Sequence, residues 1–197
     1  MSDHDHDHGD HDHGGDGDEY ELEAEARARR QAALSQIRQY GDPILRMRAN
    51  EVESFDEELV QLTVRMLTLE HDADGIGLAA TQVGILRRVF VFHNGDYEDL
   101  VVVNPVLTKM GVGVDVHEEG CLSLGPVRVP VERSVEVTLE GVSTDGAPLR
   151  FELEGWTAFV AQHELDHLDG KLIIDRTDPE SRREALAQLR PKLVLSR

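Results

Sequence analysis

The sequence lacks several features that would assign it to common classes of protein. Its 197 residues include one cysteine, Cys121, so no disulfide can form within the chain. The longest mostly apolar stretch, GIGLAATQVGIL, is too short to span a membrane and contains Gln82. The N-terminus has no basic segment followed by an apolar one, so we expect no secretory signal. A free thiol suits the reducing cytoplasm, where we expect the protein to act.

Basic residues are scarce. Lys and Arg number 20 against 39 Asp and Glu, giving a formal net charge of −19. Residues 1–26 contain seven Asp, four Glu and no Lys or Arg, so they carry −11 and leave −8 on the remaining chain. An acidic body argues against binding DNA through a basic face.

Residues 1–18 form a tail of low complexity, MSDHDHDHGDHDHGGDGD. Asp, His and Gly bury too little apolar surface to offset chain entropy, so we expect this tail to be disordered. It is either a solvated tail or a metal-binding one, because imidazoles are good metal ligands. The imidazoles are those of His4, His6, His8, His11 and His13.

The remaining chain has helical patterns in four segments, two before and two after a central region rich in β-branched residues. Residues 19–35 are rich in Ala, Glu and Arg and predict an N-terminal helical extension. The segment 55–70 has apolar residues three or four apart, which predicts an amphipathic helix with Asp56 as its N-cap. Helical spacing returns at WTAFVAQHELDHLDGKLI, where Gly170 occupies a C-cap position. A short helix ended by Pro191 closes the chain.

Between these helices the sequence is rich in β-branched residues. The runs RRVFVF, LVVVNPVL, VRVPV, SVEVTLEGV and LRFELEG are separated by Gly and Pro, as strands are. Strands followed by a helix, without regular alternation of the two, predict an α+β fold. We assign residues 36–197 to one catalytic domain.

The hexapeptide QHELDH contains the spacing His-Glu-x-x-His. His163 and His167 are four residues apart on a helix, so both imidazoles can reach one metal ion. Glu164 can hold a metal-bound water as a general base. The alternative is two surface histidines on a charged helix. Asp166 is either a hydrogen-bonding partner of the metal ligands or a plain surface acid, and we favour the latter.

A catalytic metal usually has three protein ligands, and this helix offers two. A downstream glutamate would suit a thermolysin-like peptidase, whereas a thiolate with two imidazoles also makes a catalytic site. Cys121 is favoured by its loop, HEEGCLSLG, although a lone cysteine can also be a small buried apolar residue. The candidates for the third ligand are Glu180 and Glu184 downstream and His71, His93, His117 and Cys121 upstream.

Three segments in this order resemble the signatures of the peptide deformylase family. They are GIGLAATQ at 75–82, EGCLS at 119–123 and QHELDH at 162–167, and the resemblance covers about residues 36–190. The loop after Ser123 departs from many relatives, because Gly125 precedes Pro126. The resemblance implies mixed, mainly antiparallel sheets packed around a central helix that carries the His-Glu-x-x-His motif.

The same resemblance implies the reaction and its metal. The enzyme would hydrolyse the N-formyl group from the formyl-methionine of newly synthesised polypeptides and release formate. It would use one divalent ion, Fe²⁺ in most relatives, with Zn²⁺, Ni²⁺ or Co²⁺ able to take its place. The implied metal ligands are Cys121, His163 and His167.

Further residue roles also follow from the resemblance. Glu164 would be the general base, and Gln82 and the Leu122 backbone N–H would stabilise the oxyanion. The backbone around Ile76, Gly77 and Gly120 would pair with the peptide. The implied contacts to the methionine side chain and the rest of the substrate come from Ile76, Phe159, Val160 and Arg128.

The C-terminal segment 178–197 reverses the charge of the chain, with five bases and three acids. Some relatives dock a C-terminal helix on the ribosome, so the ribosome is a predicted partner; a solvated helix face is the alternative. We expect a monomer that binds neither DNA nor membranes. Two other hypotheses are a metallopeptidase that does not need Cys121 and a metal store led by the histidine-rich tail.

Overall fold

The computed structural model describes residues 15–93 and 99–190, with side chains from Tyr20 onward. The expected tail therefore lies outside the described residues up to position 14, as does Pro191. The helices and strands, in chain order, are α1 (Gly15–Gln36), η1 (Pro43–Arg46), α2 (Glu57–Asp72), β1 (Gly77–Ala79), η2 (Ala80–Val83), β2 (Val89–His93), β3 (Asp99–Met110), β4 (Val114–Gly120), β5 (Arg128–Ser134), β6 (Glu136–Val142), β7 (Pro148–Glu154), α3 (Trp156–Leu168), η3 (Ile173–Asp175) and α4 (Pro179–Leu189).

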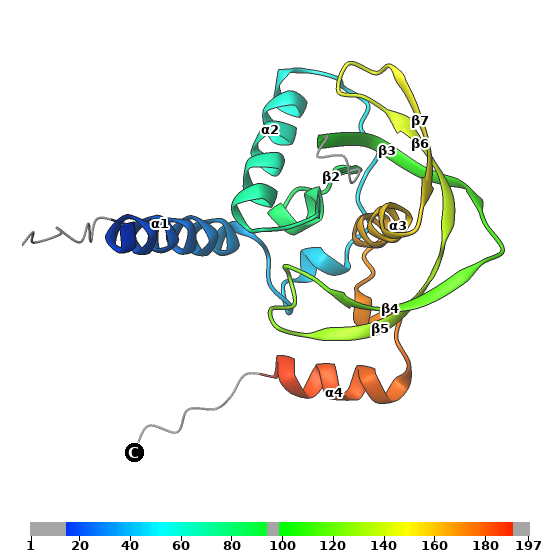
Figure 1. Ribbon diagram of the computed structural model, residues 1–197. Coiled ribbons are helices and arrows are strands. Elements are labelled where there is room, and N and C mark those ends of the chain that lie inside the picture. Colours follow the sequence, from blue (N-terminus) through cyan, green and yellow to red (C-terminus); the bar gives the residue numbers. More distant parts are fainter. Residues whose placement is uncertain (1–14, 94–98, 191–197) are drawn as a thin grey trace, which may run out of the picture.

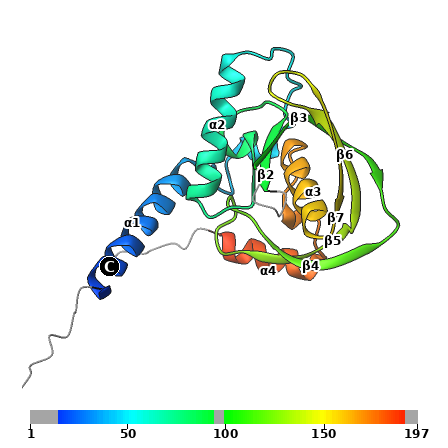
Figure 2. The same cartoon turned by 45° about the horizontal axis from the view of Figure 1, so that its top comes forward.

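Helix α3 lies at the centre of the molecule, inside the curve of the sheets (Figures 1 and 2). One sheet has the strand order β1-β2-β3-β6-β7 and the other pairs β4 with β5; every pairing between these strands is antiparallel. This arrangement confirms the predicted α+β fold with mainly antiparallel sheets around the helix that carries His-Glu-x-x-His.

Strand β2 is buried on both faces. Val89 and Val91 pack into a core shared with α2, whereas Phe90 and Phe92 pack into a core shared with α3. All four side chains are fully buried, because alternate residues of a strand point to opposite faces and both faces here are covered by helices. The continuous apolar run VFVF is therefore what this central position requires.

Helix α2 confirms the amphipathic helix predicted from the spacing of its apolar residues. Asp56 is its N-cap, as expected, and accepts a hydrogen bond of 3.0 Å from the Leu59 backbone N–H. Leu59, Met66 and Leu69 are buried against the first core. Because α2 runs directly into the β1 segment, its position fixes one wall of the groove described below.

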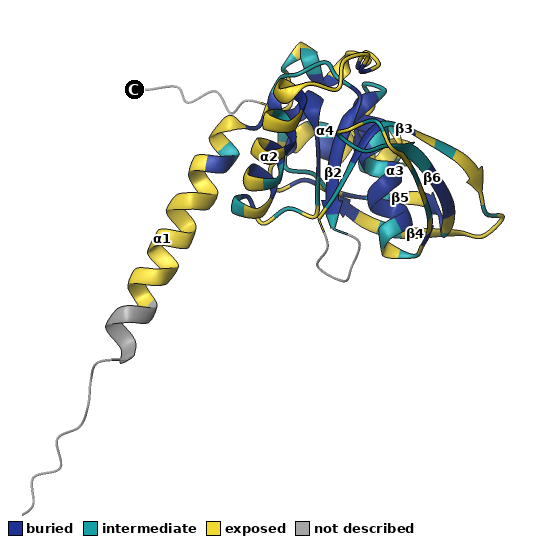
Figure 3. Ribbon diagram, turned by 90° about the horizontal axis from the view of Figure 1, so that it is seen from above, coloured by how far each residue is buried: buried dark blue, intermediate teal, exposed yellow. Residues whose placement is uncertain are grey.

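Helix α1 projects from the body of the protein, and most of its described side chains are exposed (Figure 3). The helix starts at Gly15, four residues before the predicted extension and inside the expected tail. Ala33 is buried near its C-terminal end, and Ile37 is buried just beyond it. Helix α1 therefore owes its form mainly to the propensity of Ala, Glu, Leu and Arg rather than to packing.

Helix α4 covers β5 at the bottom of the molecule in Figure 1. Asp178 caps its start by accepting hydrogen bonds from the Glu180 and Ser181 backbone N–H groups, and Ala185 is buried in the third core. None of the helices in the described part is long and apolar enough to cross a membrane.

Candidate active site

The site is built around the middle of α3, where His163, Glu164 and His167 share one region of the helix. The two imidazole rings are 4.9 Å apart between centroids. Gln162 fixes the helix against β5: its Nε2 donates 2.8 Å to the Ser134 carbonyl, and its Oε1 accepts 3.1 Å from the Ser134 N–H. The first residue of QHELDH therefore holds the helix in register with the sheet.

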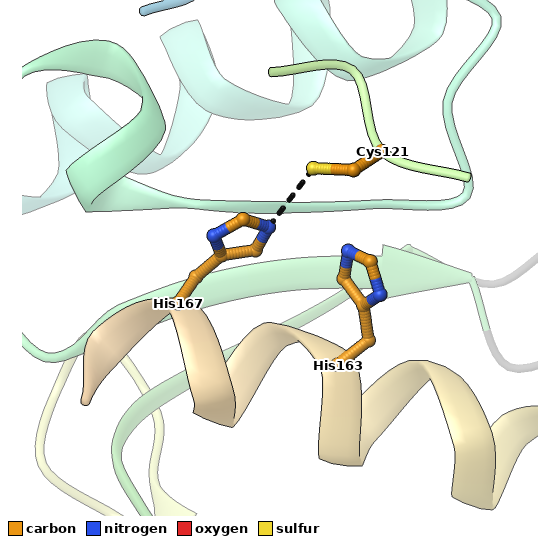
Figure 4. Close-up of side chains that lie close together, drawn as sticks. All are labelled: Cys121, His163 and His167. Atoms are coloured by element: carbon orange, nitrogen blue, oxygen red, sulfur yellow. Dashed lines mark hydrogen bonds between the residues drawn. The ribbon is translucent and has the colours of Figure 1, made fainter. Parts of the chain in front are cut away.

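Cys121 faces this helix from the turn that follows β4 (Figure 4). Its Sγ lies 3.2 Å from Nε2 of His167, and one donor atom from each of Cys121, His163 and His167 lies within 4.8 Å of the other two. Three converging N and S donors of this kind could hold one divalent ion. Sequence reasoning left six candidates for the third position, and chain packing brings Cys121 beside the histidines.

The other candidates lie elsewhere. His117 stacks on Phe159, with ring centroids 4.1 Å apart, and His71 and His93 belong to a separate group of donors. Glu180 and Glu184 are exposed on α4. None of them belongs to the Cys121 group among the described residues.

A buried charged network supports His163. Glu119 accepts 2.8 Å from Nδ1 of His163 and also accepts from Arg133 at 2.8 and 3.0 Å. Burial by itself raises the pKa of Glu119, but the hydrogen bonds from His163 and Arg133 outweigh it and lower that pKa to about 2. The Glu119 carboxylate thus stays ionised and fixes the orientation of the His163 ring through Nδ1. The other ring nitrogen, Nε2, takes no part in this hydrogen bond.

Asp166 belongs to the same network, so the prediction of a plain surface acid was wrong. It is buried and accepts hydrogen bonds from Arg133 at 2.6 Å and from Arg176 at 2.9 Å. The helix face that carries Asp166 is covered by β5 and by the segment around Arg176. Glu119, Arg133 and Arg176 were not identified from the sequence, since their partners are distant in the chain.

Glu164 is buried at the floor of the groove. Burial raises its pKa to about 7, despite the opposing charge of His163. Its Oε2 has no hydrogen-bond partner among the described residues. The carboxyl group therefore has a free acceptor site and a proton affinity suited to exchange near neutral pH.

Gly77 allows β1 to pass directly over Glu164. A Cβ atom at this position would lie 2.5 Å from Oε1 of Glu164, so any side chain here would displace the Glu164 carboxylate. At Gly120, by contrast, a Cβ would meet Arg128 at 3.4 Å, an ordinary contact. Steric exclusion therefore explains the glycine at 77, and no such exclusion acts at 120.

Gln82 is held with its amide nitrogen toward Cys121. Its Oε1 accepts 2.8 Å from the Ala79 N–H, which fixes which end of the amide points inward. Its Nε2 lies 3.2 Å from the Ser123 hydroxyl oxygen and 3.7 Å from the sulfur of Cys121. A neutral donor is thus aimed at the site.

A cavity of about 600 Å³ opens over these groups, a size suited to a small ligand or a short peptide segment. The residues predicted to contact the substrate all line it, namely Ile76, Gly77, Gly120, Leu122, Arg128, Phe159 and Val160. The sequence did not single out Arg30 and Leu34 of α1, or Trp156, which also line it. These residues line the cavity only because α1 and the start of α3 pack against the body of the protein in this way. No local pattern in the sequence predicts that packing.

This α+β fold, with His-Glu-x-x-His on a central helix and a cysteine beside its histidines at an open cavity, defines a hydrolase of the metal-dependent class. Comparisons with known proteins give the family. Residues 34–183 match the family described as polypeptide deformylase. The chain belongs to this family, and it removes the N-formyl group from newly synthesised polypeptides.

Individual relatives and a solved structure support the same family. Peptide deformylase 1 of Corynebacterium glutamicum is 43% identical over 161 residues, covering 80% of this chain and 95% of that protein. The Thermotoga maritima peptide deformylase is 45% identical over 147 residues, covering 75% and 89%. A crystal structure of a peptide deformylase from Legionella pneumophila superposes with a TM-score of 0.74 at 37% identity, covering 78% of this chain and 91% of that one.

Proposed function

We propose that Cys121, His163 and His167 hold the single catalytic ion of this deformylase. The observation that carries the assignment is the convergence of their three donor atoms within 4.8 Å of one another. The hydrogen bond from Nδ1 of His163 to Glu119 supports it, because it leaves Nε2 of that ring free to bind. When bound, such an ion polarises a carbonyl oxygen and makes hydroxide available near neutral pH.

Glu164 is the proposed general base. Its buried carboxylate takes a proton from the attacking water as the C–O bond to the formyl carbon forms. It then gives that proton to the leaving nitrogen as the C–N bond breaks, which releases formate and a free amine. The pKa of Glu164, raised to about 7 by burial, and the free acceptor at Oε2 both support this exchange.

Gln82 and the Leu122 backbone N–H are the proposed donors to the oxyanion. The hydrogen bond from Ala79 N–H to Oε1 of Gln82 supports the role of the side chain, because it presents Nε2 to the site without any reorientation. An amide donates without adding charge and does not compete with Glu164 for the proton.

The substrate is proposed to bind as an added strand along β1. The backbone of Ile76 and Gly77 on one side, and of Gly120 on the other, would pair with the peptide main chain. The methionine side chain would lie against Ile76, Phe159 and Val160, which line the cavity. Arg128, exposed at the rim, is proposed to contact the peptide beyond the methionine.

Replacing Cys121 by Ser tests the metal assignment. We expect metal affinity to fall by more than the roughly 10–100-fold that loss of an outer hydrogen-bonding partner costs, with activity falling in parallel. The measurement is metal content after dialysis against a chelator, alongside formate release from a formyl-methionyl peptide. The metallopeptidase hypothesis predicts unchanged affinity. A metal store led by the tail predicts that removal of residues 1–18 removes most of the metal and that Glu164→Ala changes nothing measurable. Either result contradicts the proposal.

The proposed native ion is Fe²⁺. Mixed N and S donors suit both iron and zinc. Rates of formate release after anaerobic loading with Fe²⁺, Zn²⁺, Ni²⁺ or Co²⁺ would rank the ions.

We further propose that the enzyme acts in the cytoplasm, since a reducing compartment keeps the Cys121 thiol available. We also propose that it is a monomer.

We propose that α4 contributes to a contact with the ribosome. Arg183 of this helix and Arg190, directly after its end, are exposed and available to an anionic surface, whereas Arg182 already pairs with Asp175 at 3.3 Å. Because Ala185 lies in the third core, substitutions test this better than truncation. Arg183→Glu with Arg190→Glu is expected to reduce co-sedimentation with ribosomes at low salt. Unchanged co-sedimentation, with Glu184→Gln as the matched control, would rule the contact out.

A further inference from the structure

A second group of metal-binding side chains lies where α2, β2 and β3 meet. Glu70 and His71 stand in the last turn of α2, His93 ends β2, and Asp99 begins β3. Oε2 of Glu70 is 3.1 Å from Nε2 of His93 and 3.5 Å from Nε2 of His71. The two imidazole rings stack with centroids 4.9 Å apart. These residues share no ligand with the Cys121 site.

The spacing of these atoms matches a metal polyhedron. Donors bound at about 2.0–2.1 Å in a tetrahedral zinc site lie about 3.4 Å from one another. The contacts of 3.1 and 3.5 Å from Glu70 to the two imidazoles bracket that value. The three residues could therefore bind one ion with little movement.

Glu70 gives an independent reason to place a cation here. Its side chain is fully buried, and neither carboxylate oxygen makes a hydrogen bond among the described residues. Burying a carboxylate without partners is costly, and a bound cation removes that cost.

Asp99 completes the arrangement. Its Oδ1 is hydrogen-bonded to Nε2 of His71 at 3.0 Å and lies 2.8 Å from Nδ1 of His93. That nitrogen of His93 is buried and forms no hydrogen bond among the described residues. Asp99 thus places a second carboxylate beside both imidazoles, where it could serve as a further ligand.

We propose that Glu70, His71 and His93 form a second binding site for a zinc-class divalent ion, with Asp99 as a further carboxylate beside both imidazoles. The donors are two imidazoles and a carboxylate, with no sulfur, a set that suits Zn²⁺. The ion would join the end of α2 to the strands β2 and β3, directly before the β1 segment that borders the active-site groove. This inference does not depend on the role of Cys121.

Zinc stoichiometry tests the site in the full-length chain. The five tail histidines at positions 4, 6, 8, 11 and 13 would also bind Zn²⁺, so all proteins carry His→Asn at these positions. We expect two Zn²⁺ per chain in this background, one after His71→Asn, one after Cys121→Ser and none after both. His71 is half-exposed, so its replacement should leave the fold intact, which circular dichroism checks.

Cobalt spectra separate the two sites. With Co²⁺, a thiolate-to-metal absorption band should persist in His71→Asn and vanish in Cys121→Ser, while the weaker ligand-field bands of bound cobalt persist in both. Added Zn²⁺ should raise the melting temperature of the Cys121→Ser variant, and the rise should disappear when His71→Asn is added to it.

A Zn²⁺ count that His71→Asn and His93→Asn both leave unchanged, whether it is one or two ions per chain, would overturn the second site. Glu70→Gln removes the charge at nearly constant shape and should also reduce the count to one. Formate release measured on the same His71→Asn samples keeps the outcomes separate. If His71→Asn loses one ion and keeps its activity, the lost ion belongs to the second site and not to the catalytic one. If the Cys121 assignment is wrong, Cys121→Ser will keep its full metal content.

Discussion

Replacing Glu164 by Gln is expected to slow formate release by roughly 10²–10⁴-fold, the usual contribution of a positioned general acid–base group. The amide keeps the shape of the side chain but can no longer take a proton from water. Since the substitution leaves Cys121, His163 and His167 intact, metal content should stay unchanged. The measurement is kcat on a formyl-methionyl peptide, with bound metal determined on the same sample.

Glu184→Gln is the matched control, because Glu184 is exposed on α4 and outside the groove. It should leave the rate unchanged. A Glu164→Gln enzyme with a rate close to that of the unsubstituted protein, at equal metal content, would show that proton transfer does not depend on Glu164. A rate that falls only in proportion to lost metal would mean that Glu164 supports binding rather than chemistry.

Replacing Arg133 by Met is expected to lower the free energy of unfolding by about 3–5 kcal/mol, the cost of removing one partner from a buried ion pair. Arg133 is buried between Glu119 and Asp166, and its loss leaves both carboxylates without their shared cation. Asp166 keeps Arg176 as a partner, so Glu119 is the more affected group. Urea denaturation with the metal content matched measures the change.

Arg150→Met is the control, since Arg150 also contacts two carboxylates, Glu140 and Glu152, but on the surface. Exposed pairs of this kind contribute about 0–1 kcal/mol. Equal losses in the two variants would contradict the special role of the buried network.

The effect of Arg133→Met should also depend on pH. The pKa of Glu119 is lowered from its ordinary 4.5 to about 2, so the ionised network stabilises the fold above about pH 4.5. That stabilisation is lost as the pH falls toward 2, because the unfolded chain takes up the proton first. The stability gap between the Arg133→Met variant and the unsubstituted protein should therefore narrow below pH 4.5. A gap independent of pH would indicate lost packing rather than lost charge.

Features set by neighbours in the chain were predictable. The spacing of Leu59, Met66 and Leu69 predicted α2, and Asp56 caps it as expected. His163 and His167 share one face of α3 because four residues make about one helical turn. The α+β class followed from strand-like runs placed between helical ones. Each of these features depends on a period or a cap that lies within a few residues.

Features set by distant residues were not predictable. Asp166 was expected at the surface because its own helix gives no sign that β5 and Arg176 cover it. The role of Glu119 depends on Arg133 and His163, which lie 14 and 44 residues away. The same holds for the group at Glu70, His71 and His93, since α2 and β2 must meet before it exists.

By itself, the sequence determined which residues could do the chemistry: one thiol, two imidazoles a helical turn apart and a glutamate beside the first. The tertiary structure decided which of them meet. It set Cys121 against α3, aimed Nε2 of Gln82 inward and covered Glu164 with Gly77. The physical reason is that geometry within a helix is fixed by its local hydrogen bonds, whereas the approach of one element to another is fixed by the packing of the whole core.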